Sequence, residues 1–228
     1  MMVRVVWYGH ACWSIEGDKA TILIDPFITG NPEAPTTADK VKADYIIVTH
    51  GHGDHIGDAV DIAKRTGATV ISNYEIVSYC QAKGVSNVHP LHIGGGFNFP
   101  FGRVKLTIAH HGSGLPDGSY GGCAAGVILE IGGKRLYHAG DTALFLDMQL
   151  IGRGGLDAAM IPIGDNFTMG PDDALEAVKL LQPKVVFPMH YGAFDVIKQD
   201  PQAWKERVEK ETQAKVVVLR PGEGYAID

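Results

Sequence analysis

The sequence predicts a mixed α/β (α+β) fold in which two similar halves pack together. Strand-like and helix-like segments alternate in both halves of the chain, and this alternation is typical of the α/β classes. A weak internal sequence repeat accompanies it. The pair "TILIDPF" and "ADYIIVTHGHGD" in the first half resembles the pair "RLYHAGDT" and "LDAAMIPIGDN" in the second. We therefore expect a single domain, residues 1–228, made of halves of about residues 1–115 and 116–228.

Short runs rich in β-branched and aromatic residues predict the strands, because each run is ended by Gly, Pro or Asp. The run at 124–141 contains Gly132-Gly133 and is expected to form a hairpin that turns there. The predicted strands cover residues 3–9, 20–27, 44–50, 68–73, 104–112, 124–141, 157–164, 184–190 and 214–227.

Four segments carry the marks of helices. In the first, apolar residues recur at helical spacing and Gly67 is a plausible stop. The third opens with Pro171 and acidic residues, and the fourth has Asp200 as an N-cap before Pro201. The predicted helices cover residues 55–67, 74–84, 170–183 and 200–212.

Composition narrows the classes of protein. The 228 residues are 45% hydrophobic and 20% charged, and the formal net charge is −6. An acidic balance argues against a nucleic-acid partner, which needs a clustered basic surface. The three cysteines are far apart and odd in number, so we expect no disulfide framework. With no signal-peptide pattern and no apolar run of about 20 residues, the expectation is a cytoplasmic protein without a membrane partner.

The stretch "YIIVTHGHGDHIGD" at 45–58 crowds imidazoles and carboxylates into the end of a predicted strand. His50 and His52 are two apart in an extended segment, so both can project to the same side. Asp54 and His55 follow at the turn into a helix. These side chains suit zinc and other first-row metals, and turn chemistry does not ask for H-x-H-x-D-H. A metal site is therefore favoured over a solvated loop.

Three later strands end in the same kinds of residue, as a site built at one edge of a sheet requires. They are followed by His110 and His111, by His138 and Asp141, and by His190. Neighbouring residues of a strand point to opposite faces, so only one of His110 and His111 should bind. We assign His138 to structure.

The ordered set "THGHGDH", "AHHGS", "HAGDT" and "PMHYG" resembles the metallo-β-lactamase superfamily. "GHACW", "ILIDPFITGNP", "GDNFTMGP" and "FPMHYGAF" extend the likeness over nearly the whole chain to the UPF0173 metal-dependent hydrolases, which are related to the ascorbate-phosphate lactonases. The resemblance implies a four-layer αββα sandwich with metals at one edge of its two sheets. It also implies that one metal is held by His50, His52 and His111, a second by Asp54, His55 and His190, and that Asp141 bridges them.

This resemblance implies two divalent metal ions, with zinc first and manganese, nickel or iron as alternatives. Two metals about 3.5–4 Å apart can share a water and lower its pKa, and the resulting hydroxide attacks the substrate. Asp54 is then the catalytic residue as well as a ligand, because it can orient the hydroxide. Four further residues are expected to support the ligands or to contact substrate, each with an ordinary turn, loop or packing role as the alternative: His10, Asp25, Asn166 and Tyr191.

The function expected from these features is binuclear hydrolysis of a small-molecule ester, lactone or phosphate-bearing substrate. Two alternatives stay open: a nucleic-acid phosphodiesterase of the same superfamily, and a non-catalytic metal-binding module. The acidic charge counts against the first, and the complete set of ligands counts against the second. The resemblance further suggests a homo-oligomer.

Overall fold

The computed structural model describes residues 2–227 and arranges their strands in two seven-stranded sheets. The first sheet has the order β14-β1-β2-β3-β4-β5-β6 and the second β13-β12-β11-β10-β9-β8-β7. The first sheet consists of β1 (Val3–Trp7), β2 (Trp13–Gly17), β3 (Ala20–Ile24), β4 (Tyr45–Ile47), β5 (Thr69–Asn73), β6 (Val88–Leu91) and β14 (Gly224–Ile227). The second consists of β7 (Gly96–Phe99), β8 (Gly102–Ile108), β9 (Ala125–Ile131), β10 (Lys134–His138), β11 (Leu156–Pro162), β12 (Pro183–Met189) and β13 (Lys215–Val216).

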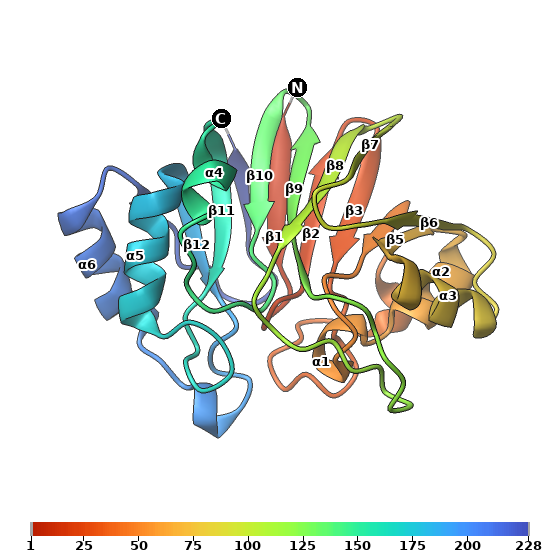
Figure 1. Cartoon of the computed structure of the whole chain (residues 1–228). Helices are drawn as coiled ribbons and strands as arrows, with labels where there is room; N and C mark the ends of the chain where they lie inside the picture. Colours follow the sequence, from red (N-terminus) through yellow and green to blue (C-terminus); the bar gives the residue numbers. More distant parts are fainter. Residues whose placement is uncertain (1, 228) are drawn as a thin grey trace.

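Helices lie outside both sheets. Helices α2 and α3 flank the first sheet, and α4, α5 and α6 flank the second (Figure 1). This helix–sheet–sheet–helix layering confirms the predicted fold class. The helices are α1 (Gly53–Ile56), α2 (Ala59–Thr66), α3 (Tyr74–Ala82), α4 (Met148–Gly152), α5 (Pro171–Leu181) and α6 (Pro201–Glu211), with 3₁₀ turns η1 (Ala38–Lys40) and η2 (Asp195–Ile197).

The central strands are apolar on both faces, which explains their unbroken hydrophobic sequence. On β3, Ile22 and Ile24 belong to the core between the sheets, whereas Leu23 belongs to the core under α2 and α3. On β4, Ile47 and Ile46 divide in the same way. Parallel strands covered by helices on one face and a second sheet on the other need apolar residues throughout.

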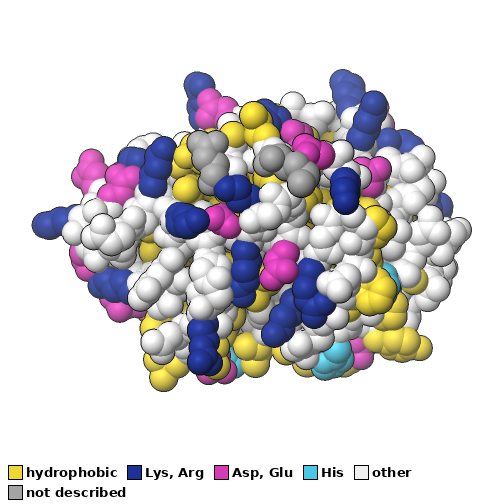
Figure 2. Space-filling model, turned by 90° about the horizontal axis from the view of Figure 1, so that it is seen from above, with side chains coloured by type: hydrophobic (Ala, Val, Ile, Leu, Met, Phe, Trp, Pro, Cys, Tyr) yellow, Lys and Arg dark blue, Asp and Glu magenta, His cyan; other side chains and the backbone are white. Residues whose placement is uncertain are grey.

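The pairing of the strands brings their polar ends to one edge. Strands β3 to β6 run parallel, as do β10 to β13. Parallel strands share their carboxyl edge, so the residues after β3, β4, β10 and β12 meet there. This edge holds α1 and lies at the bottom of Figure 1. The opposite pole carries Lys and Arg interspersed with Asp and Glu (Figure 2).

The sheets do not divide where we expected the two halves to meet, near residue 115. The division falls between β6 and β7, and the C-terminal strand β14 returns to the first sheet. Strand β14 pairs antiparallel with β1, from Val3 opposite Ile227 to Val6 opposite Gly224. It thereby satisfies backbone groups that an open edge would leave unpaired. Within residues 2–227 no helix is long and apolar enough to cross a membrane.

Helix α6 begins as the sequence predicts, and its cap gives a first testable result. The Asp200 carboxylate accepts hydrogen bonds from the backbone N–H groups of Gln202 and Ala203, at 2.9 and 3.1 Å. Removing such a cap typically costs about 1 kcal/mol. We expect Asp200→Ala to lower the free energy of unfolding in urea by about that amount. Asp195→Ala, which removes an exposed ion pair with Lys198, is the control and should change it by less than about 0.5 kcal/mol.

Candidate metal centre

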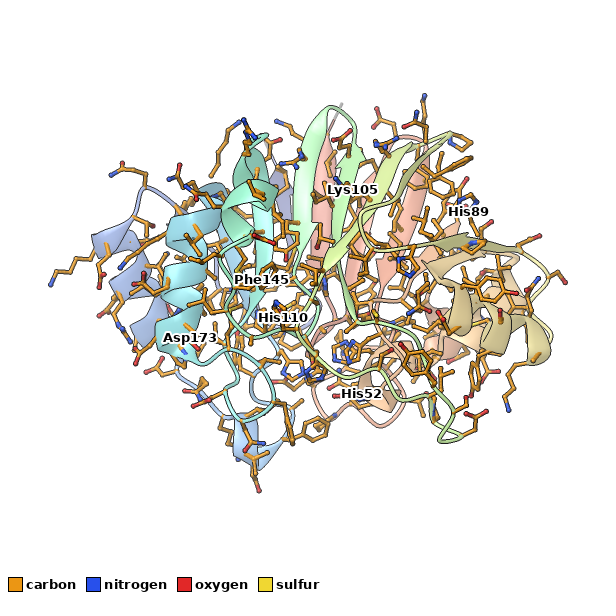
Figure 3. All side chains as sticks on the ribbon, in the orientation of Figure 1. His52, His89, Lys105, His110, Phe145 and Asp173 are labelled. Carbon is orange, nitrogen blue, oxygen red and sulfur yellow. The ribbon has the colours of Figure 1, made fainter. Side chains whose placement is uncertain are left out.

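The seven predicted metal ligands lie together at the carboxyl edge of the sheets. The ligand atoms of His50, His52 and His111 lie within 4.8 Å of one another. Those of Asp54, His55 and His190 lie within the same distance, and His10 joins this second group. Figure 3 places His52 and His110 at this edge, on segments that come from different sheets. Four segments far apart in sequence therefore contribute to one cluster.

Asp141 stands between the two groups. Its Oδ2 atom lies 3.0 Å from His190 Nε2, 3.5 Å from His111 Nε2 and 4.0 Å from His50 Nε2. Its Oδ1 atom lies 3.2 Å from His55 Nε2. One carboxylate thus contacts members of both groups, as a residue that bridges two metals must.

Hydrogen bonds behind the cluster orient two of the imidazoles. The Thr49 hydroxyl donates its one proton to Asp25 at 2.6 Å, so it accepts from His50 Nδ1 at 3.0 Å. His55 Nδ1 donates to Asp25 Oδ2 at 2.8 Å. With both Nδ1 atoms engaged in this way, each ring turns its Nε2 toward Asp141. Such outer hydrogen bonds fix the tautomer of metal-binding histidines.

Three residues of the centre adopt strained backbone conformations. His10, Asp25 and His190 have φ angles of 52°, 46° and 56°, in the left-handed region that costs other residues than glycine about 1–3 kcal/mol. The surrounding structure holds them: the His190 N–H donates to the His10 carbonyl at 3.1 Å, and the Asp25 N–H donates to the Ile47 carbonyl at 3.0 Å. Strain of this kind clusters at functional sites.

The donor set fits divalent metals. Asp141 Oδ1, His55 Nε2 and His190 Nε2 are buried, and none of them has a hydrogen-bond partner among the described residues. These atoms lie close together without the alignment of a hydrogen bond, an arrangement that is costly for buried polar groups. A cation shared among them would satisfy all three. Imidazole nitrogens with carboxylate oxygens are ligands that zinc and its first-row neighbours accept.

The electrostatics suit ligands of a cation. Burial and the neighbouring His55 hold the pKa of His50 well below its usual range. Burial raises the pKa of Asp141, but His190 and His55 reverse this and hold it well below its usual range. Burial lowers the pKa of His55, but Asp141 and Asp25 hold it well above its usual range. A metal that bound His55 would have to displace a proton from it, because only the neutral imidazole is a ligand.

Comparison with known proteins decides the family. The model of the family described as "Beta-lactamase superfamily domain" matches residues 20–191. A UPF0173 metal-dependent hydrolase of Heliobacterium modesticaldum is 53% identical over 235 residues, covering 100% of this chain and 98% of that protein. A second, from Thermus thermophilus, is 49% identical and covers 100% of both chains. The chain belongs to the UPF0173 metal-dependent hydrolases of the metallo-β-lactamase superfamily.

A solved structure agrees. The metallo hydrolase Igni18 from the archaeon Ignicoccus hospitalis superposes with a TM-score of 0.91 and 40% identity, covering 100% of this chain and 99% of that one. The protein is thus a metal-dependent hydrolase with the fold that the sequence predicted.

The two neighbouring histidines of the hydrolase take different places. His111 reaches Asp141 and keeps 16% of its side chain exposed. His110 is exposed and forms a T-shaped contact with the Phe145 ring, with centroids 5.1 Å apart. Both lie just beyond the end of β8 rather than inside it. The two side chains therefore differ in the contacts that they make, and the alternation of side chains along a strand is not the reason.

Of the four expected supporting residues, two lie against the ligands. Asp25 is fully buried and accepts from Thr49 and His55, which is more than the turn role considered for it. His10 Nε2 lies 3.0 Å from Asp54 Oδ2, and burial and His190 lower its pKa to about 4. The neutral ring therefore donates from Nε2 and orients the Asp54 carboxylate.

The other two have contacts of a different kind. The Tyr191 ring is buried and stacks on Trp7 at 5.4 Å, the packing role of the two considered for it. Asn166 is exposed in a turn, where its N–H donates to the Asp165 side chain. His138, assigned to structure, contacts the Ala11 carbonyl through Nε2 at 3.0 Å and accepts from the Gly140 N–H. It links the two sheets behind the centre.

Sequence reasoning missed two hydroxyl residues that position the predicted ligands. One is Thr49, which looks like an ordinary β-branched strand residue. The other is Ser113, whose hydroxyl accepts from the Gly51 N–H at 3.0 Å and donates to the Gly121 carbonyl at 2.8 Å. It joins the His50–His52 segment to the loop that carries His111. The signal available in the sequence was a hydroxyl placed next to, or two residues from, a predicted ligand.

Asp25 provides a test of the supporting hydrogen bonds. Asp25→Asn keeps the size of the side chain but removes the charge that holds His55. Loss of such a partner lowers metal affinity about 10–100-fold, and we expect that loss in a chelator competition. Asp44→Asn is the matched control, because Asp44 accepts from the Thr21 N–H at the opposite end of β4. Equal affinities for the two variants would contradict the role of Asp25.

Proposed function

We propose that this protein is a binuclear hydrolase that cleaves a small-molecule ester, lactone or phosphate-bearing substrate with two divalent metals. The observation that carries the proposal is the position of Asp141, which contacts one ligand group through His50 and His111 and the other through His55 and His190. His50, His52 and His111 would hold one metal, and Asp54, His55 and His190 the other. Zinc is the first candidate, and manganese, nickel and iron are alternatives.

The bound metals would lower the pKa of a water molecule and polarise the oxygen under attack. The protein's own residues supply the orientation. Asp54 is the carboxylate that substrate and water can reach, since 31% of its side chain is exposed against 3% for Asp141. The hydrogen bond from His10 fixes the orientation of the Asp54 carboxylate. The carboxylate can then accept a hydrogen bond from the attacking water and orient it. His190 and His50, by contrast, are buried.

Metal titration tests the proposal. Protein freed of metal by chelator and returned to zinc or manganese in steps should hydrolyse p-nitrophenyl esters or phosphates with a rate that saturates at about two equivalents. Saturation at one equivalent would contradict the binuclear mechanism. Absence of hydrolysis with any of these metals, although they bind, would contradict the choice of substrates and metals together.

A further inference from the structure

The loops around the metal centre are nearly free of basic residues. The ligands, their supporting residues and the loops that carry them lie in segments 8–12, 25–37, 49–58, 109–124, 139–147, 163–170 and 190–200. Together they contain one Lys and no Arg, whereas acidic residues occur in six of them. That Lys198 pairs with Asp195 at 2.6 Å. Arg220, on the neighbouring turn whose Gly222 N–H donates to the Trp7 carbonyl, pairs with Glu223. Basic side chains gather instead on other surfaces, including the opposite pole (Figure 2).

Phosphate recognition normally uses Arg or Lys in addition to any metal. A substrate with a second anionic group would find on these loops no Lys or Arg that is not already paired with a carboxylate, and would meet exposed acids such as Asp165. The charge of the rim therefore disfavours phosphate esters, nucleotides and other polyanions, and it favours a substrate that arrives without charge.

Two aromatic rings stand beside the exposed ligand. Phe27 and Phe194 both meet the His10 ring edge-on, with centroids 5.7 and 5.5 Å away. The two rings lie 6.4 Å apart and are inclined by 30°. His10 in turn contacts Asp54 at 3.0 Å, so the pair is one imidazole away from the reachable carboxylate. Phe27 is buried, but Phe194 is 37% exposed and presents apolar surface.

We propose that the substrate is a neutral carboxylic ester or lactone whose apolar part packs on the wall formed by Phe27 and Phe194. This inference rests on the proposed function and narrows its substrate class. Hydrolysis adds water across the acyl–oxygen bond: the acyl carbon gains the hydroxyl, the bond to the leaving oxygen breaks, and that oxygen takes the proton. The product carries a new carboxylate, which the acidic rim would help to expel. Phe194 is a specificity-determining residue in this arrangement, because an aryl or alkyl group that covers it leaves water.

Binding of metal-directed probes tests the wall without catalysis. Acetohydroxamate and phenylacetohydroxamate carry the same metal-binding group and are neutral in solution at pH 7, but only the second has an aromatic ring. By calorimetry on the metal-loaded protein, we expect phenylacetohydroxamate to bind at least about tenfold more tightly. Phe194→Ala should reduce that ratio below about threefold, whereas Phe97→Ala, at an exposed Phe on β7, should leave it unchanged. Equal affinities for the two probes would overturn the apolar wall.

Kinetics with one leaving group separate this inference from the proposed function. The substrates are p-nitrophenyl phenylacetate, p-nitrophenyl acetate, p-nitrophenyl phosphate and bis(p-nitrophenyl) phosphate. We expect the phenylacetate ester to have the highest kcat/KM relative to its uncatalysed rate, and Phe194→Ala to raise its KM but not that of the acetate. If a phosphate ester is preferred, the binuclear hydrolase stands and the substrate class is wrong. If none is cleaved although the hydroxamates bind to the metals, the proposed function fails as well.

Discussion

Asp141→Asn is expected to reduce metal content from about two ions per chain to one or fewer and to lower hydrolysis at least about 100-fold. The side chain is 3% exposed and lies between four histidines. Asn has nearly the same shape but no charge, and its amide group would turn a donor toward the cluster. The effect should exceed that of Asp25→Asn, because Asp141 contacts the ligand atoms themselves. Elemental analysis and the rate of p-nitrophenyl ester hydrolysis measure the two losses.

Breaking a buried charge cluster also costs stability, on the order of 3–5 kcal/mol. Urea unfolding and circular dichroism therefore have to accompany the comparison. Asp147→Asn, an exposed acid six residues further along the same loop, is the matched control and should keep both metals. A folded Asp141→Asn protein with two metals and full activity would remove Asp141 from the centre.

His111→Ala is the second large effect, and His110→Ala is its control. The first removes one of three imidazoles whose ligand atoms lie within 4.8 Å, so we expect the affinity of that group for zinc to fall at least about 100-fold. The second removes an exposed ring that packs on Phe145, and we expect a change of less than about threefold. Chelator competition on both variants measures the difference.

The backbone of His110 keeps its contacts in either variant, since its N–H donates to the Thr142 hydroxyl and its carbonyl accepts from Ala143. The loop after β8 should therefore stay in place, and the comparison reports on the side chains alone. The opposite order of affinities would exchange the roles of the two histidines.

The sequence predicted the parts of the fold where local pattern and tertiary packing agree. The apolar runs of β3, β4, β11 and β12 are buried on both faces, and the caps of α5 and α6 are marked by Pro and Asp. Short elements without such agreement were not predicted. Strand β6 contains Pro90, β7 begins in a glycine cluster, and α4 spans five residues. Their conformation depends on neighbours that only the folded chain supplies.

The candidate site followed from the sequence for a related reason. Polar residues that end parallel strands must meet at one edge, so His50, Asp141 and His190 could be grouped before their positions were known. The hydrogen bond from Thr49 to Asp25 could not, because it crosses between strands, and neither residue has a metal-ligand pattern of its own. The wall of Phe27 and Phe194 likewise depends on two loops whose approach no local pattern specifies.

In the proposed centre two metals share the Asp141 carboxylate, so the number of metals bound per chain distinguishes it from a mononuclear site. The measurement is elemental analysis of protein purified without chelator and then supplied with zinc, with weakly bound metal removed by gel filtration. We expect about two ions per chain in the native protein. One ion per chain, with Asp54, His55 and His190 all replaceable without its loss, would contradict it.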